Sequence, residues 1–72
     1  MTNTSLLLDR IERSGLKMGF IAKQIKISRS TLHRKINNVT YFNQYEIEKL
    51  CELLRITNAK EREAIFFAKH VD

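Results

Sequence analysis

The apolar residues of this 72-residue chain gather in five short groups, each at the three- and four-residue spacing of an α-helix. No segment alternates between apolar and polar residues as a strand does, and the chain contains no proline and no Asn-Gly or Asp-Gly hairpin turn. The pattern predicts an all-α fold of five short helices. A chain of this length buries one small core, so residues 1–72 are expected to form a single domain.

The first two groups predict two short helices. The first is expected over residues 5–14, where Thr4 or Ser5 can cap its start and Gly15 suits the left-handed position after its end. Its apolar members are Leu7, Leu8 and Ile11. The second helix is only two turns long, and its apolar members are Ile21, Ala22 and Ile25.

The signals for the fourth helix, over residues 44–54, are the sharpest in the chain. Asn43 and Glu46 have the spacing of a capping box, and Phe42 and Ile47 can form a hydrophobic staple across the same turn. The expected buried stripe of this helix is Ile47, Leu50, Cys51 and Leu54.

A fifth helix is predicted over about residues 58–69, with Thr57 or Asn58 as its cap. Residues 64–68 are apolar without interruption. Five successive apolar residues cover most of the circumference of a helix, which is more than one core-facing stripe requires. The surplus predicts a contact with another copy of the chain, and the alternative is a helix that simply exposes one Phe. The residues expected in that contact are Ile65, Phe66 and Phe67.

Several classes of protein are excluded by composition. Cys51 is the single cysteine, so it forms no internal disulfide, and with His33 and His70 it does not make a four-ligand zinc site. The few carboxylate pairs lie on expected helix surfaces with no cleft, so we expect no enzyme, metal, cofactor or small-molecule ligand. No apolar run is long enough for a membrane span and no signal peptide is evident, which predicts a cytoplasmic location.

The net charge of +5 is confined to the middle of the chain. Residues 13–45 contain seven Lys or Arg and no Asp or Glu, whereas the flanks, 1–12 and 46–72, each carry a net charge of −1. Such an asymmetry indicates a polyanionic partner, although a solvated basic face that only maintains solubility has the same composition.

The third predicted helix, from about Ser28 to Asn37, combines an apolar stripe with an arc of base-reading side chains. Ser28 is a suitable N-cap, and the stripe is Leu32 and Ile36. Beside it lie four polar residues within an arc of about 140°. They are Arg29, Ser30, His33 and Arg34. Arginine bonds guanine bidentately, serine and histidine donate or accept, and a helix fits the major groove, so this arc predicts DNA recognition.

Two cations flank the start of the same helix, where the macrodipole disfavours positive charge. Lys26 precedes the helix and Arg29 begins it. Each such residue costs about 0.3 to 1 kcal/mol. Cations held against the dipole are expected where an external anion such as DNA phosphate is the neighbour.

The string Ile27-Ser28-Arg29-Ser30-Thr31-Leu32, with Ala22 before it and Ile36 after it, resembles the helix-turn-helix of the Cro and repressor family of phage and bacterial transcription regulators. The likeness covers about residues 6–56, with the helix-turn-helix at about 18–37. More loosely, residues 64–68 are similar to the ending of small Cro-like proteins from phages of Gram-positive bacteria.

The resemblance implies a lambda-repressor-like fold in which the start of the third helix reads bases. It implies phosphate contacts by residues around the second helix and after the third. They are Lys17, Met18 through its backbone N–H, Lys23, Ser28, Lys35, Asn38 and Thr40. The chain departs from the family at three places: Lys26 stands at the usual turn glycine, Lys17 and Met18 replace the usual cap and glutamine, and Phe20 replaces a polar residue.

The expected function is therefore sequence-specific binding of double-stranded DNA by a small transcriptional regulator. A homodimer joined through the last helix would read a pseudo-palindromic operator. The alternative is a protein-interaction module, such as an antitoxin or anti-repressor, that works through Phe66, Phe67 and Val71.

Overall fold

The computed structural model describes residues 1–69, and within them the chain forms five α-helices and no strand. The helices are α1 (Thr4–Ser14), α2 (Met18–Gln24), α3 (Arg29–Ile36), α4 (Gln44–Leu54) and α5 (Ala59–Phe66). The prediction of an all-α fold with five short helices is confirmed. Residues 70–72, which include His70 and Val71, lie outside the described part of the chain.

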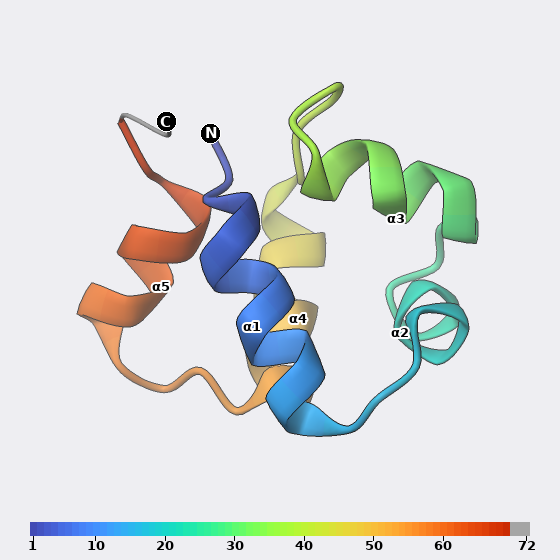
Figure 1. Cartoon of the computed structure of the whole chain (residues 1–72), viewed down its shortest axis with the longest axis horizontal. Helices are drawn as coiled ribbons and strands as arrows, with labels where there is room; N and C mark the ends of the chain where they lie inside the picture. The colour runs from blue at the N-terminus through green and yellow to red at the C-terminus, as the bar shows by residue number, and fades with distance from the viewer. Residues whose placement is uncertain (70–72) are drawn as a thin grey trace.

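The helices pack into a body of about 27 × 25 × 21 Å in which α1 is central. It contacts α3, α4 and α5, while α2 packs on α3 and α4. In Figure 1, α2 is seen nearly end-on and α3 lies across the view, so their axes cross rather than run parallel. The pair α2 and α3 occupies one side of the body, and α5 occupies the other together with the start of the chain.

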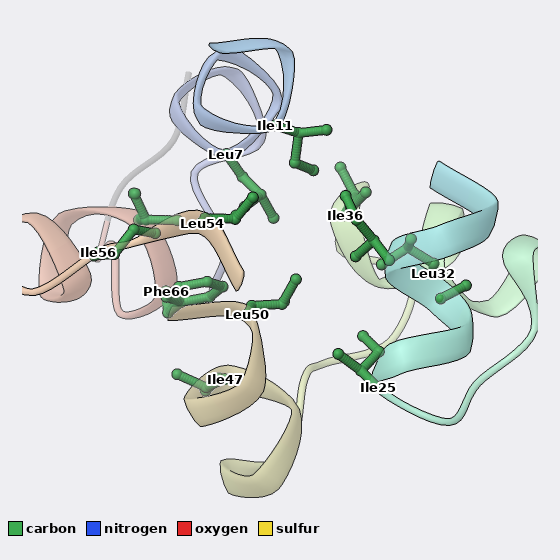
Figure 2. Close-up of a cluster of buried hydrophobic side chains, with 13 residues drawn as sticks. Leu7, Ile11, Ile25, Leu32, Ile36, Ile47, Leu50, Leu54, Ile56 and Phe66 are labelled. Atoms are coloured by element: carbon green, nitrogen blue, oxygen red, sulfur yellow. The ribbon is translucent and has the colours of Figure 1, made fainter. Parts of the chain in front are cut away.

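One cluster of apolar side chains holds the helices together, and Figure 2 shows it from within. Every helix contributes to it. The rings of Phe66 and of Phe42, in the segment before α4, pack edge to face with their centroids 5.9 Å apart. The buried apolar residues are Leu7, Ile11, Ile21, Ala22, Ile25, Leu32, Ile36, Ile47, Leu50, Leu54, Ile56, Ile65 and Phe66. Leu8, which the sequence pattern assigned to the first stripe, is 42% exposed instead.

Side chains cap four of the five helices at their first turn. Ser28, Asn43 and Asn58 cap α3, α4 and α5, as predicted, and the capping box of Asn43 and Glu46 is complete. The cap of α1 differs from the prediction, because Asn3 accepts the Leu6 N–H at 3.1 Å. Thr4 is not the cap, since its hydroxyl donates to the carbonyl oxygen of Ile36 at 2.6 Å.

Four helices end in a left-handed residue. Gly15 does so at φ 74°, as expected, and so do three residues that have a Cβ: Lys26 at φ 64°, Asn38 at φ 64° and Arg55 at φ 57°. After α2 the Ile27 N–H donates to the Ala22 carbonyl at 3.0 Å, which completes a Schellman motif. Lys26, at the position of the usual turn glycine, therefore adopts the left-handed conformation itself. A pair of backbone hydrogen bonds of this kind also closes α3 and α4.

The last helix is shorter than predicted. It ends at Phe66 rather than at about residue 69, because the chain there pairs with the N-terminal segment. The Asn3 N–H donates to the Ile65 carbonyl at 2.7 Å, and the Ala68 N–H donates to the Met1 carbonyl at 2.9 Å. These bonds replace the hydrogen bonds of a further helical turn.

We predict that Arg55→Gly stabilises the fold by about 0.5–1 kcal/mol, because glycine adopts the left-handed conformation without the steric cost of a Cβ. The Arg55 backbone carbonyl, which accepts from Arg10, is retained. Thermal unfolding should show a midpoint higher by a few degrees. Arg55→Ala keeps the Cβ and serves as the control, so an equal rise in both variants would contradict the explanation.

Candidate nucleic-acid interface

Helix α3 has one face in the core and the opposite face in solvent. Leu32 and Ile36 anchor it, with 0% and 1% of their surface exposed. The four residues predicted to read bases are all exposed on the remaining arc, and they are Arg29, Ser30, His33 and Arg34. Because Leu32 and Ile36 are fixed in the core, the packing of the helix decides which way this arc faces.

The first turn of α3 leaves backbone donors open to an anion. The Ser28 hydroxyl oxygen accepts a hydrogen bond from the Thr31 N–H at 3.1 Å, and the hydroxyl donates one to Thr31 Oγ1 at 2.8 Å. The N–H groups of Arg29 and Ser30 have no acceptor within the described residues. These open donors and the positive end of the helix dipole favour a negative group at this position.

Helix α2 presents a second set of donors. Its N-cap residue, Lys17, is exposed and makes no capping hydrogen bond, as its side-chain type predicted. The N–H groups of Met18, Gly19 and Phe20 therefore have no side-chain acceptor in the first turn. Lys23 is exposed near the other end of the helix.

The turn between α2 and α3 carries a further exposed cation. The Lys26 ammonium lies 5.9 Å from the ring centroid of Tyr45, in the first turn of α4. A contact of this kind is worth about 0.5–1 kcal/mol at an exposed site. Lys26 therefore has a preferred position beside the start of α3, and no carboxylate among residues 1–69 pairs with it.

Lys35 does not belong to this interface, which corrects the prediction of a phosphate contact. Its Nζ lies 2.6 Å from Oε1 and 2.8 Å from Oε2 of Glu46, and the two side chains are only 14% and 5% exposed. Glu46 Oε1 also accepts the Asn43 N–H at 2.9 Å. One buried carboxylate thus ties α3 to the capped start of α4, and the charge of Lys35 is neutralised inside the protein.

Asn38 is also directed away from an external phosphate. Its Oδ1 accepts the Thr2 N–H at 2.8 Å and its Nδ2 donates to the Thr2 carbonyl at 2.8 Å. Its backbone N–H closes α3 on the Lys35 carbonyl at 3.3 Å. This corrects the predicted phosphate contact of Asn38. Thr40, in the same loop, is exposed and stays a predicted contact.

Once the ion pairs are assigned, a smaller set of free cations remains in the basic segment. Arg13 pairs with Asp9 at 3.1 Å and Lys35 pairs with Glu46. The other five have no carboxylate within 4.0 Å among residues 1–69, and we call them the basic surface. They are Lys17, Lys23, Lys26, Arg29 and Arg34. All of them are on α2, on α3 or beside these helices.

Asn37 is a residue of this face that the sequence reasoning missed. It follows the last turn of α3, is exposed, and donates through Nδ2 to the His33 carbonyl at 2.9 Å. This bond fixes the amide group beside His33 and leaves Oδ1 free to accept. The four-residue spacing from His33 was the available signal, because it places Asn37 on the same helical arc.

Of the three residues predicted to contact another copy of the chain, only Phe67 is exposed. Ile65 and Phe66 are buried in the core of their own chain, so they are not available to a partner. Phe67 is 48% exposed, and with the exposed side chains of Met1 and Tyr41 it borders a cavity of about 170 Å³. We call Met1, Tyr41 and Phe67 the apolar patch. The run of five apolar residues was misleading because the helix ends inside it.

Cys51 is a packing residue at the edge of the core. Burial raises the pKa of its thiol above the ordinary value, so the reactive thiolate is disfavoured. No group of three His, Cys, Asp or Glu side chains suited to a metal ion occurs within residues 1–69.

Comparison with models of protein families, with curated proteins and with solved structures found no match to this chain. None of the helices in the described part of the chain has the length and apolar character needed to cross a membrane.

We predict that Glu46→Gln lowers the free energy of unfolding by about 3 kcal/mol, because it leaves the Lys35 ammonium largely buried without a counter-ion. Urea denaturation measures the change. Glu52→Gln is the matched control, since Glu52 is exposed and meets Lys49 only at 4.0 Å, and its effect should stay within about 0.5 kcal/mol. Equal effects of the two variants would show that the buried pair has no special role.

Proposed function

We propose that this chain is a sequence-specific double-stranded DNA-binding regulator of transcription, in which α2 and α3 act as a helix-turn-helix of the Cro and repressor kind. In this proposal it works in the cytoplasm without a cofactor, by occupying an operator. The second helix lies over the DNA backbone, and α3 enters the major groove with its exposed arc toward the base edges.

The observation that carries the proposal is the two-sided environment of α3. Its buried side is fixed by Leu32 and Ile36. Its open side holds two arginines, a serine and a histidine, and within residues 1–69 no carboxylate lies within 4.0 Å of the arginines or the histidine. Guanidinium groups bond guanine bidentately, and the serine and histidine side chains donate or accept. An α-helix with its side chains is about 10–12 Å across, which fits the width of the major groove.

Phosphate contacts are assigned to the groups that border this arc. The cations Lys17 and Lys23 and the open N–H of Met18 belong to α2 and its start. Ser28 caps the start of α3 and Thr40 lies in the loop after it. A phosphate at Ser28 would accept the hydroxyl hydrogen bond that Ser28 now donates to Thr31 Oγ1. Lys35 and Asn38 are not included.

A second copy is proposed to dock on the apolar patch. An exposed aromatic ring, Phe67, stands directly beside a cavity lined by Phe42, Ile47 and Phe66. A protruding side chain next to a recess suits a two-fold contact, in which each copy fills the recess of the other. Two reading helices related in this way would enter successive major grooves about 34 Å apart on a pseudo-palindrome.

Selection of bound duplexes from a random pool, followed by titration across salt concentrations, tests DNA binding. The affinity of the selected duplex should fall steeply with salt. Arg29→Ala and Arg34→Ala should each cost about 1–3 kcal/mol and relax the preference at one base position. Lys23→Ala should weaken all duplexes alike and reduce the salt slope by about 1 per copy.

The matched control is Lys60→Ala, which removes an exposed cation from α5 on the other side of the body. It should leave affinity and salt slope unchanged. Arginine variants that bind as well as the parent chain, or a parent chain that enriches no sequence, would contradict the proposal.

The exposed patch also favours the second candidate function, a protein-interaction module such as an antitoxin or anti-repressor. Of the residues first assigned to that role, Phe66 is buried and Val71 lies outside the described residues. Phe67 remains, together with Met1 and Tyr41. The two functions differ in what the patch binds.

We predict that Phe67→Glu abolishes self-association in sedimentation and weakens operator binding at the same time, because it places a charge in an apolar contact. The fold should be nearly unaffected, since the side chain is half exposed. Leu8→Glu, at another exposed apolar position, is the control. If Phe67→Glu leaves DNA binding intact and loses only a different protein partner, the interaction module is the correct reading.

A further inference from the structure

The first four residues form hydrogen bonds to two parts of the molecule that are distant in sequence. Residues Met1–Thr4, which we call the N-terminal clasp, lie between the end of α5 and the loop that follows α3 (Figure 1). No base-reading or phosphate-contacting role is assigned to any of them. Their contacts nevertheless involve the end of the proposed recognition helix.

On the α3 side, the clasp makes three side-chain hydrogen bonds. Thr2 exchanges two with the Asn38 amide group, both at 2.8 Å, and the Thr4 hydroxyl donates to the Ile36 carbonyl at 2.6 Å. Thr2 is only 3% exposed, although it is polar and lies at the start of the chain. Water therefore does not compete freely for these groups.

The Thr4 bond completes the pairing at the end of α3. The carbonyls of His33, Arg34 and Lys35 accept from the backbone N–H groups of residues 37–39. The Ile36 carbonyl accepts from Thr4. Three of these carbonyl oxygens therefore accept from the residues that directly follow the helix, and the fourth accepts from the clasp.

On the α5 side, the clasp is held by backbone groups. The Asn3 N–H donates to the Ile65 carbonyl at 2.7 Å, the Ala68 N–H donates to the Met1 carbonyl at 2.9 Å, and the Met1 nitrogen donates to the Ala68 carbonyl at 3.3 Å. The clasp is therefore a bridge, with one end fixed on α5 and the other on α3.

We propose that Thr2, Thr4 and Asn38 are positioning residues that set the orientation of α3 for DNA. The inference rests on the proposed function, because it assigns these residues to the same recognition helix. An eight-residue helix has little stability of its own. Base readout depends on side-chain placement within about half an ångström. A bridge that fixes the C-terminal end of α3 against α5 therefore affects affinity more than folding.

The test uses Asn38→Gly and Thr4→Val in the full chain. Glycine keeps the left-handed conformation at φ 64° and removes only the two amide bonds to Thr2. Valine has nearly the shape of threonine and removes only the hydroxyl that reaches Ile36. Arg55→Gly is the control for the first variant, because Arg55 is left-handed too. Thr4→Ser retains a hydroxyl and is the rescue for the second.

Amide hydrogen exchange gives a readout that does not require DNA. The amide of Asn3 donates from the clasp to Ile65, and the amide of Val39 closes the end of α3 on the Arg34 carbonyl. In Asn38→Gly both amides should exchange about tenfold faster, while those of α4 keep their rates. Affinity for the selected duplex should fall about tenfold in Asn38→Gly and in Thr4→Val. The salt slope should stay unchanged, because no cation is lost. Arg55→Gly and Thr4→Ser should bind like the parent chain.

Unchanged exchange at Asn3 and Val39 would overturn the bridge, whatever the chain binds. Faster exchange with unchanged affinity would overturn the positioning role and leave DNA binding standing. A reduced salt slope in Asn38→Gly would overturn it as well, because it would indicate a lost phosphate contact. If the parent chain enriches no duplex at all, the proposed function fails and the positioning role fails with it, and the exchange rates then still decide whether the bridge holds α3.

Discussion

The burial of Leu32 and Ile36 decides which face of α3 meets the solvent. Both side chains lie inside the single core, and they occupy one side of a helix of eight residues. Turning the helix by one residue position, about 100°, would move the apolar stripe out of the core and bring charged groups into it. The cost of such a rotation makes the direction of Arg29 and its neighbours a consequence of the core.

Two polar connections add to this anchoring. Both involve residues, Lys35 and Asn38, that the sequence alone suggests are free on the surface. Glu46 holds Lys35 on one side of α3, and Thr2 holds Asn38 beyond its end. Each connection takes a group away from an external ligand and uses it to join α3 to another element. What remains outside is the set of five cations of the basic surface, which is smaller than the charge count of the middle segment indicates.

Local signals in the sequence were sufficient for the helices and their starts. Caps such as Ser28 and the capping box of Asn43 depend on residues two or three positions apart, so the sequence alone reveals them. The left-handed position of Lys26 was indicated only by the resemblance, in which glycine usually stands there. The arc of four polar residues on α3 followed from helical spacing, and all four are exposed.

Contacts between distant segments were not predictable in this way. No local pattern indicates that Lys35 pairs with Glu46, eleven residues later, or that Asn38 pairs with Thr2, thirty-six residues earlier. The end of α5 was misplaced because the pairing of residues 1–3 with residues 65–68 stops the helix inside an apolar run. Ile65 and Phe66, which were predicted to contact a partner, are therefore buried in the core.

The most direct measurement of the central claim is a titration of the ¹⁵N-labelled chain with a DNA duplex, followed by amide chemical shifts. The account predicts that the largest changes occur at the first turns of α2 and α3 and at His33 and Arg34, with α5 almost unaffected at low protein concentration. Changes confined to α5 and the apolar patch, or no changes at low salt, would contradict it.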